Sequence, residues 1–182
     1  MKIKDVIGEC LLKIGETNFV DETSYSDEQQ ATINKLLGAL NIAYREIVTS
    51  YLPLVHKQKA TLKDGKIKAS ELEKSIVYPI SVKQDGEKMS FYTDSTCIFC
   101  NGDGEVEIKY AYVPSKAFVL ADSVDDMRLT ISVMSDATLA EYYFQEKVFE
   151  LAKSFDTDFR AQISLLRYKG RNLRVKRRGW HA

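Results

Sequence analysis

The chain begins with two stretches whose apolar residues recur at helical spacing. Residues 2–14 form the first, which Gly15 ends. The second starts at Ser26, where Gln29 three positions later completes a capping-box pattern, and it runs to Pro53, which a helix interior does not accommodate. Its apolar positions are Ile33, Leu36, Leu37, Leu40, Tyr44, Ile47, Val48 and Tyr51. This pattern predicts a long helix that forms the spine of the fold.

After Pro53 the spacing of apolar residues changes from that of a helix to that of a strand. Alternating segments are separated by three turns that contain glycine, at Asp64-Gly65, at Asp85-Gly86 and at residues 101–104. Asp-Gly pairs favour tight hairpins because both residues tolerate positive φ. Pro79 lies in one alternating run and indicates an edge strand, since proline has no N–H to donate. We expect five or six short strands in a small antiparallel sheet or partial barrel.

The second half of the chain returns to helical patterns. Apolar and polar residues alternate over 129–133, which predicts an extended segment that crosses back towards the helices. Ser135 is a suitable N-cap for a helix that continues to Phe155. A last helix is predicted to begin at Asp156 and to end at Gly170.

The helix predicted over 135–155 carries apolar residues on two faces. Such a helix is either central in a core or packed against another subunit. Tyr142 and Phe149 lie on the second, aromatic face. Because tyrosine and other aromatic residues are enriched at protein interfaces, these two residues are candidate subunit contacts.

These segments predict an α+β fold in a single domain, residues 1–182. A helical bundle forms from the N- and C-terminal helices, with an inserted small antiparallel β-sheet or barrel and an extended C-terminal arm. The predicted parts are the helical part (1–53 and 134–169), the β insertion (54–118), a connecting segment (119–133) and the C-terminal arm (170–182).

The composition is that of an ordinary globular protein, with 45% hydrophobic and 29% charged residues. No apolar run approaches the length of a membrane span, and no segment resembles a signal or transit peptide. We expect a protein that acts in the cytosol, or in an assembly built there, without a membrane partner.

The formal net charge of zero conceals an asymmetry between the body and the C-terminal arm. Five of the 26 lysines and arginines lie in the arm, which has no acidic residue, so the rest of the chain carries 21 basic against 26 acidic side chains. An acidic body with a basic arm favours contact between copies of the chain, or with a separate acidic partner. It is not the pattern of a DNA-binding body, which is basic over a whole face.

The arm itself admits two interpretations. It is either a solvated terminus, or a segment that docks on another surface through its arginines and through the chain's only tryptophan. On the second interpretation the partner-binding residues are Arg171, Arg174, Val175, Lys176, Arg177, Arg178 and Trp180.

The three cysteines are too few for the disulfide framework of a small secreted domain. Cys97 and Cys100 have the spacing of a metal-binding or redox pair, and Cys10 lies on the first helical stripe. Zinc requires four ligands, however, and the chain has no second pair and only His56 and His181 as histidines. A redox pair would open a helix, whereas this one runs into a hairpin turn. We therefore predict reduced, buried thiols and no metal site.

No segment carries a recognisable catalytic pattern. Residues 101–105 lack the ligand spacing of a calcium loop, and Asp122, Asp125 and Asp126 form an acidic loop that is more typical of capping than of catalysis. Glycine-rich phosphate loops and hydrolase signatures are absent. The sequence therefore predicts no catalytic or cofactor-binding residue and a protein that is not an enzyme.

The order of the elements and the closing residues resemble the head-to-tail adaptor, or connector, proteins of short-tailed bacteriophages. The resemblance rests on a long N-terminal helix, a β excursion after Pro53, a second long helix with Thr138-Leu-Ala140 and Leu151-Ala-Lys153, and a basic end at Arg177-Arg-Gly-Trp180. It covers nearly the whole chain and is architectural rather than based on one motif. It implies a helical bundle with a β extension that assembles into a ring, commonly a dodecamer, whose C-terminal arms reach the portal or neighbouring subunits.

The resulting hypothesis is a structural virion protein at the phage head-tail junction, assembled in the host cytoplasm. Its expected partners are the portal protein, other copies of itself in the ring, and other tail or adaptor proteins, with incidental contact to packaged DNA. The alternative is a nucleic-acid-binding module that uses the same basic arm, in which case affinity for free duplex DNA falls steeply with salt.

Overall fold

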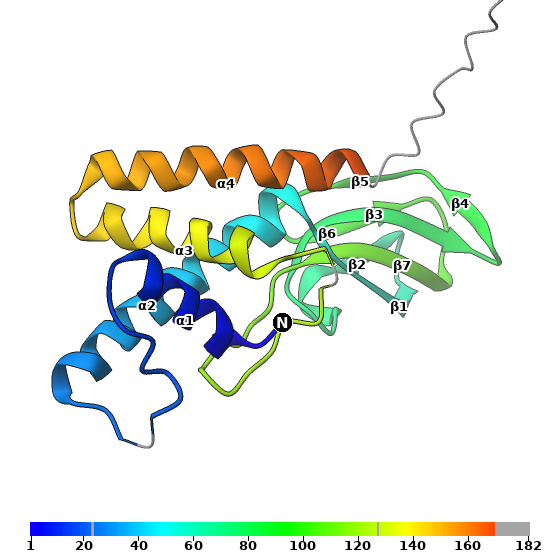
Figure 1. The fold of residues 1–182 in the computed structure, drawn as a ribbon. Coiled ribbons are helices and arrows are strands. Elements are labelled where there is room, and N and C mark those ends of the chain that lie inside the picture. The colour runs from blue at the N-terminus through cyan, green and yellow to red at the C-terminus, as the bar shows by residue number, and fades with distance from the viewer. Residues whose placement is uncertain (23, 127, 170–182) are drawn as a thin grey trace, which may run out of the picture.

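The computed structural model describes residues 1–22, 24–126 and 128–169, and its fold is α+β as expected (Figure 1). The predicted C-terminal arm lies outside these residues. The α-helices are α1 (Ile3–Lys13), α2 (Asp27–Glu46), α3 (Ile131–Gln145) and α4 (Phe149–Lys169). The strands are β1 (Leu54–Leu62), β2 (Lys66–Lys68), β3 (Ile76–Gln84), β4 (Glu87–Met89), β5 (Phe91–Thr93), β6 (Cys97–Cys100) and β7 (Gly104–Tyr112).

The long helix α2 begins as predicted, with a complete capping box. The Ser26 hydroxyl accepts the Gln29 backbone N–H at 3.2 Å, and the Gln29 side chain accepts the Ser26 N–H at 2.8 Å. At its other end the helix widens into a π-helical turn, Ile47–Tyr51, in which the Leu52 N–H bonds to the Ile47 carbonyl at 2.8 Å. Pro53 follows and ends the helix, as expected.

Helix α3 is the centre of the bundle and packs against α1, α2 and α4. Residues Val133–Leu139 are all buried, so this helix has no solvent face along two turns. It begins at Ile131, with the Thr130 hydroxyl accepting the Val133 N–H at 3.3 Å. The prediction of an extended 129–133 segment and of a cap at Ser135 was therefore wrong. The alternation of Leu129, Ile131 and Val133 was misleading because Ile131 is 37% exposed in the first turn of the helix and is not part of a buried strand face.

A break between α3 and α4 replaces the predicted continuous helix over 135–155. Lys147 adopts a left-handed conformation with φ 63°, and its N–H bonds to the Phe144 carbonyl at 3.1 Å. The Val148 N–H bonds to the Tyr143 carbonyl at 2.9 Å, which completes a Schellman turn. Helix α4 then runs without interruption from Phe149, so the helix start predicted at Asp156 was also wrong. No glycine marks this turn, and the sequence therefore carried no signal for it.

The strands form two small antiparallel sheets, in the orders β1-β7-β3-β4 and β2-β6-β5. The two Asp-Gly hairpins are confirmed, because both residues of each pair have positive φ. Pro79 lies opposite Tyr110 of β7, and on its other side β4 covers only Val82–Gln84. Among the described strands this part of β3 is thus an edge, which explains how the proline is accommodated.

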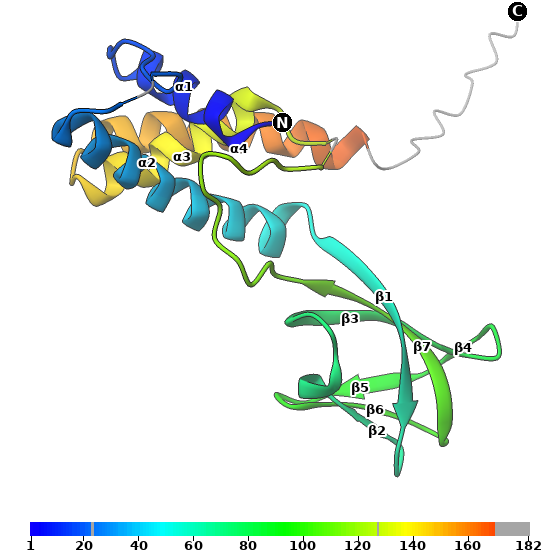
Figure 2. The same ribbon diagram turned by 90° about the horizontal axis from the view of Figure 1, so that it is seen from below.

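The described residues form two separate hydrophobic cores, one in the helical bundle and one between the two sheets. Figure 2 shows the β part projecting from one end of the bundle, with β1 leading out of it and β7 leading back. The segment after β7 returns along the bundle, where Asn41 of α2 bonds to both the N–H and the carbonyl of Phe118, at 2.6 and 3.1 Å. Further along, the Ile3 N–H bonds to the Asp122 carbonyl, and the Val124 N–H bonds to the Met1 carbonyl.

Candidate interaction surface

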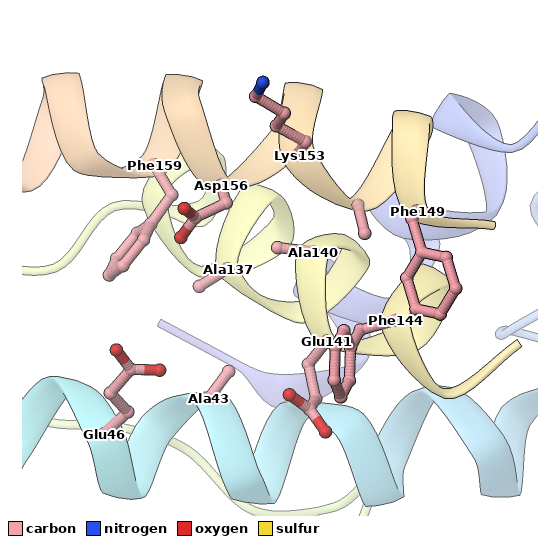
Figure 3. Close-up of a pocket in the computed structure, with 11 residues that line it drawn as sticks. Ala43, Glu46, Ala137, Ala140, Glu141, Phe144, Phe149, Lys153, Asp156 and Phe159 are labelled. Atoms are coloured by element: carbon pink, nitrogen blue, oxygen red, sulfur yellow. The ribbon is translucent and has the colours of Figure 1, made fainter. Parts of the chain in front are cut away.

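A groove of about 380 Å³ lies between α2, α3 and α4 on the helical bundle (Figure 3). Small side chains leave this space, because Ala43 of α2, Ala137 and Ala140 of α3, and Ala152 of α4 line it. Its volume falls within the range of ordinary ligand pockets. We refer to this feature as the α2–α4 groove.

One end of the α2–α4 groove is formed by exposed aromatic side chains at the turn between α3 and α4. The rings of Phe144 and Phe149 meet edge to face with centroids 5.8 Å apart. Each of these residues keeps 59% of its surface exposed, which is unusual for phenylalanine in a monomer. The two rings therefore form an exposed apolar surface, which is a candidate interaction site rather than part of the bundle core.

The other end is closed by a buried aromatic residue and by an ion pair. Phe159 packs edge to face on Tyr51 at 5.5 Å. Arg160 donates to the Asp156 carboxylate at 2.7 Å and to the Tyr51 hydroxyl at 3.0 Å. The hydrogen bond and the charge of Asp156 raise the pKa of the Arg160 guanidinium above its ordinary value. This end of the groove is thus held in a fixed geometry by α4 and by the π-helical turn.

The charged residues that line the groove are mostly acidic. They are Glu46, Glu141 and Asp156, against a single cation, Lys153. Figure 3 shows the Lys153 side chain extending away from α3 and α2, while Glu46 extends into the space between α2 and α4. Arg160 pairs with Asp156, so that Glu46 and Glu141 outweigh Lys153 by one negative charge among the remaining lining groups. The groove therefore combines an apolar floor with an acidic rim.

The two predicted subunit-contact residues lie in different surroundings. Phe149 is exposed and lines the α2–α4 groove, whereas Tyr142 is half-buried and packs on Tyr143 with ring centroids 5.3 Å apart. Tyr142 also packs against the helical core and does not line the groove. The structure thus does not bring the pair together in one patch, and it offers Phe144 as the neighbour of Phe149 instead.

The seven partner-binding residues predicted in the C-terminal arm all lie outside the described residues. These are Arg171, Arg174, Val175, Lys176, Arg177, Arg178 and Trp180. Sequence reasoning missed the groove itself. The only signal for it was the row of alanines at positions 137, 140 and 152, on segments that were otherwise interpreted as core.

The cysteines occupy the positions expected of structural thiols in two cases of three. Cys10 is fully buried, and burial raises the pKa of its thiol to about 12. Cys100 faces the β core, and burial raises the pKa of its thiol as well. Cys97 is only half-buried, contrary to expectation, because residues three apart on a strand point to opposite faces. This spacing on β6 prevents the two thiols from facing a common ion or forming a bridge. Within the ranges that the structure describes, no group of three His, Cys, Asp or Glu residues could hold a metal ion.

Asp122 and Asp126 of the acidic loop make contacts that stabilise the fold. The Asp122 carboxylate accepts the Val119 N–H at 2.9 Å, and Asp126 binds Arg128 at 2.6 Å. These hydrogen bonds lower the pKa of both carboxyl groups, which therefore remain charged at neutral pH. Arg128 also donates to the Leu52 carbonyl at 3.5 Å, so the loop fastens the chain beside the junction of the bundle and the β part.

A buried polar cluster that sequence reasoning did not foresee joins α1, α3 and α4. The Lys13 ammonium bonds to Asp136 at 2.6 Å and to the Ser135 hydroxyl at 2.8 Å, and the Gln162 amide donates to the other Asp136 oxygen. Asp136 is only 5% exposed. A buried carboxylate needs such partners because its desolvation is costly. The cluster fixes the relative position of three helices, and its groups satisfy one another.

Comparisons with known proteins add no relative: a scan against protein-family models finds no match for this chain, and neither does a search of curated proteins. Of the helices in the described ranges, none has the length and apolar character needed to span a bilayer.

Proposed function

We propose that this protein is a structural component of a phage virion, forming a ring at the head-tail junction. Its C-terminal arm docks on the portal, and its β part contacts the next tail component. The protein in this role is a connector and has no catalytic task. In a ring of more than two copies, one surface of each copy meets a different surface of the next copy.

The observation that carries the proposal is the division of the chain into two cores. The helical bundle and the β part each bury their own apolar residues, and β1 and β7 connect them. A bundle of this kind can pack side by side with its copies while the β part remains free to project. The exposed Phe144 and Phe149 supply an apolar surface on the bundle for such packing.

The charge distribution supports docking through the arm. The body carries a net charge of −5, and the arm carries five basic residues and the only tryptophan. Arginine and tryptophan are the residues that most often dominate binding energy at interfaces. Many equivalent arms on one ring would also bind a portal ring cooperatively through multivalency.

Electron microscopy of the full-length protein mixed with isolated portal rings tests this proposal. We expect an added ring of density on one end of the portal, with the same rotational symmetry as the portal. Portal rings that remain bare at saturating protein concentration would contradict it. A parallel filter-binding assay with duplex DNA at two salt concentrations tests the alternative, because a nucleic-acid-binding arm predicts tight binding at low salt that falls steeply as salt rises.

A further inference from the structure

We infer that the α2–α4 groove is the binding site for the chain's own C-terminal segment, residues 170–182, in the isolated protein. The inference does not rest on a role in a phage, because it concerns a single copy of the chain. It assigns the groove an occupant of defined chemistry, which is a basic segment with one large aromatic side chain.

Charge complementarity favours this occupant. The groove has a rim that contains Glu46 and Glu141, while Lys153 extends away from the space between the helices (Figure 3). The segment carries five basic residues and no acidic one. An acidic rim of this kind attracts arginine and lysine and discriminates against acidic segments.

The apolar part of the groove matches the apolar residues of the segment. Its floor is made of alanine side chains, and the rings of Phe144 and Phe149 stand at one end with most of their surface in solvent. Trp180 is the largest apolar group in the segment, and Val175 precedes it. Covering the two phenylalanine rings with an indole would remove exposed aromatic surface from water on both sides of the contact.

The length and starting point of the segment make the contact possible within one copy. Trp180 follows Lys169 by eleven residues, which span up to about 36 Å when extended. Phe159 and Phe149 precede Lys169 by ten and twenty residues, about 15 and 30 Å along the helix axis. The segment can therefore turn back beside α4 and reach either end of the groove. The end of the groove nearer to Lys169 is the one lined by Glu46 and Asp156, where Arg160 pairs with Asp156.

Because the segment is tethered to the groove, even a weak contact would be formed in most molecules. A short tether holds the segment near the groove at an effective concentration of about 1 mM. A free peptide with a Kd of about 0.1 mM would then be bound roughly ten times more often than not when attached. The same contact would keep the arm and the exposed phenylalanines covered until a stronger partner removes the arm.

Trp180 is the only tryptophan, so its fluorescence in the full-length protein reports directly on the segment. We expect a blue-shifted emission that resists collisional quenching and does not change over a hundredfold range of protein concentration. Phe149→Ala, and separately the double variant Glu46→Lys with Glu141→Lys, are expected to shift the emission part of the way towards that of solvent-exposed tryptophan. A tenfold loss of affinity lowers occupancy to about half.

Matched controls use exposed positions on the β part. Tyr92→Ala removes an aromatic residue that is 68% exposed, and Glu71→Lys with Glu87→Lys makes the same change in net charge. Both are expected to leave Trp180 emission unchanged, and far-ultraviolet circular dichroism checks that every variant is folded.

Three results would each overturn the inference. They are solvent-like emission in the unaltered protein, emission that does not respond to the groove variants, and a blue shift that appears only at high protein concentration. The last result would place the segment on a second copy instead. The fluorescence experiment contains no portal, so a negative result would not bear on the proposal that the arm docks on a portal. A negative result in the portal-binding experiment would likewise not bear on binding of the segment to the groove.

Discussion

Asp136 of α3 and Lys13 of α1 form an ion pair of 2.6 Å within the helical bundle, 123 residues apart in the chain. The Asp136 side chain is 7% exposed and that of Lys13 is 25% exposed. Because Gln162 of α4 also donates to Asp136, a single carboxylate holds together three helices that meet at the core.

Asp136→Ala is therefore expected to destabilise the protein strongly. It leaves the Lys13 ammonium, in a largely buried site, with only the more distant Glu9 carboxylate at 3.9 Å. Breaking such a pair costs about 2–4 kcal/mol, below the value for a fully buried pair because Lys13 retains some contact with water. Denaturant unfolding followed by circular dichroism measures the loss. The matched control is Asp21→Ala, which removes the exposed partner of Lys4 and should change the unfolding midpoint little. An equal loss of unfolding free energy in the two variants would show that the buried Asp136 pair contributes no more to stability than the exposed pair.

The Asp126–Arg128 pair should contribute to the loss of stability in acid. Its hydrogen bond lowers the pKa of Asp126 in the folded protein below the ordinary value of about 3.9. A depressed pKa means that the stabilisation is complete above the unfolded-state pKa and is lost as the pH falls through the folded-state pKa. Asp126→Asn should therefore lower the free energy of unfolding at pH 7. The gap between the variant and the original protein should then narrow below about pH 4. Unfolding curves across a pH series measure this, and a gap that stays constant with pH would contradict it.

Two glycines should respond in opposite directions to substitution by alanine. Gly65 has φ +70°, and an added Cβ would lie 2.9 Å from the Cys100 carbonyl oxygen, so Gly65→Ala should destabilise by more than about 1 kcal/mol. Gly38 lies within α2 with nothing within 4 Å of an added Cβ. Gly38→Ala should stabilise by about 0.5–1 kcal/mol, because it removes backbone freedom from the unfolded chain. Thermal unfolding of both variants is sufficient, and stabilisation by Gly65→Ala would show that the hairpin geometry is wrong.

The elements that the sequence predicted correctly are those with a local chemical signal. Ser26 and Gln29 specify the start of α2, and the Asp64-Gly65 and Asp85-Gly86 pairs specify two hairpins. The start of α3 was missed because the exposed Ile131 completes a strand-like alternation with Leu129 and Val133. The turn after α3 was missed because Lys147 takes a left-handed conformation that is usually left to glycine.

The candidate site was less predictable than the fold. Phe149 was singled out as a contact residue, but its neighbour Phe144 was not, because the turn that brings the two rings together was itself missed. The Lys13–Asp136 pair depends on the packing of helices that are remote in the chain, and no short-range pattern encodes it. The alanines of the groove appear in the sequence as ordinary core residues.

Trp180 should contribute more to portal docking than any one arginine of the arm. A buried aromatic anchor at an interface is worth about 2 kcal/mol or more, a loss of roughly thirtyfold in affinity, whereas an exposed charge pair is worth about 1 kcal/mol at most. The groove and the portal would compete for Trp180. Trp180→Ala and Arg174→Ala are therefore best compared in a protein that also carries Phe149→Ala, which weakens the competing contact with the groove. Surface plasmon resonance on immobilised portal rings measures both affinities. A larger loss with Arg174→Ala would make the arm an electrostatic contact rather than an anchored one.

The central claim is that the C-terminal arm joins this protein to a phage portal. Isolated portal rings provide the most direct test, in which the binding of the full-length chain is compared with that of a chain lacking residues 171–182. Circular dichroism and unfolding curves of the two chains serve as the control for folding. If the arm docks on the portal, the shortened chain keeps its fold and loses attachment to the portal. Attachment of the shortened chain with unchanged affinity would contradict it.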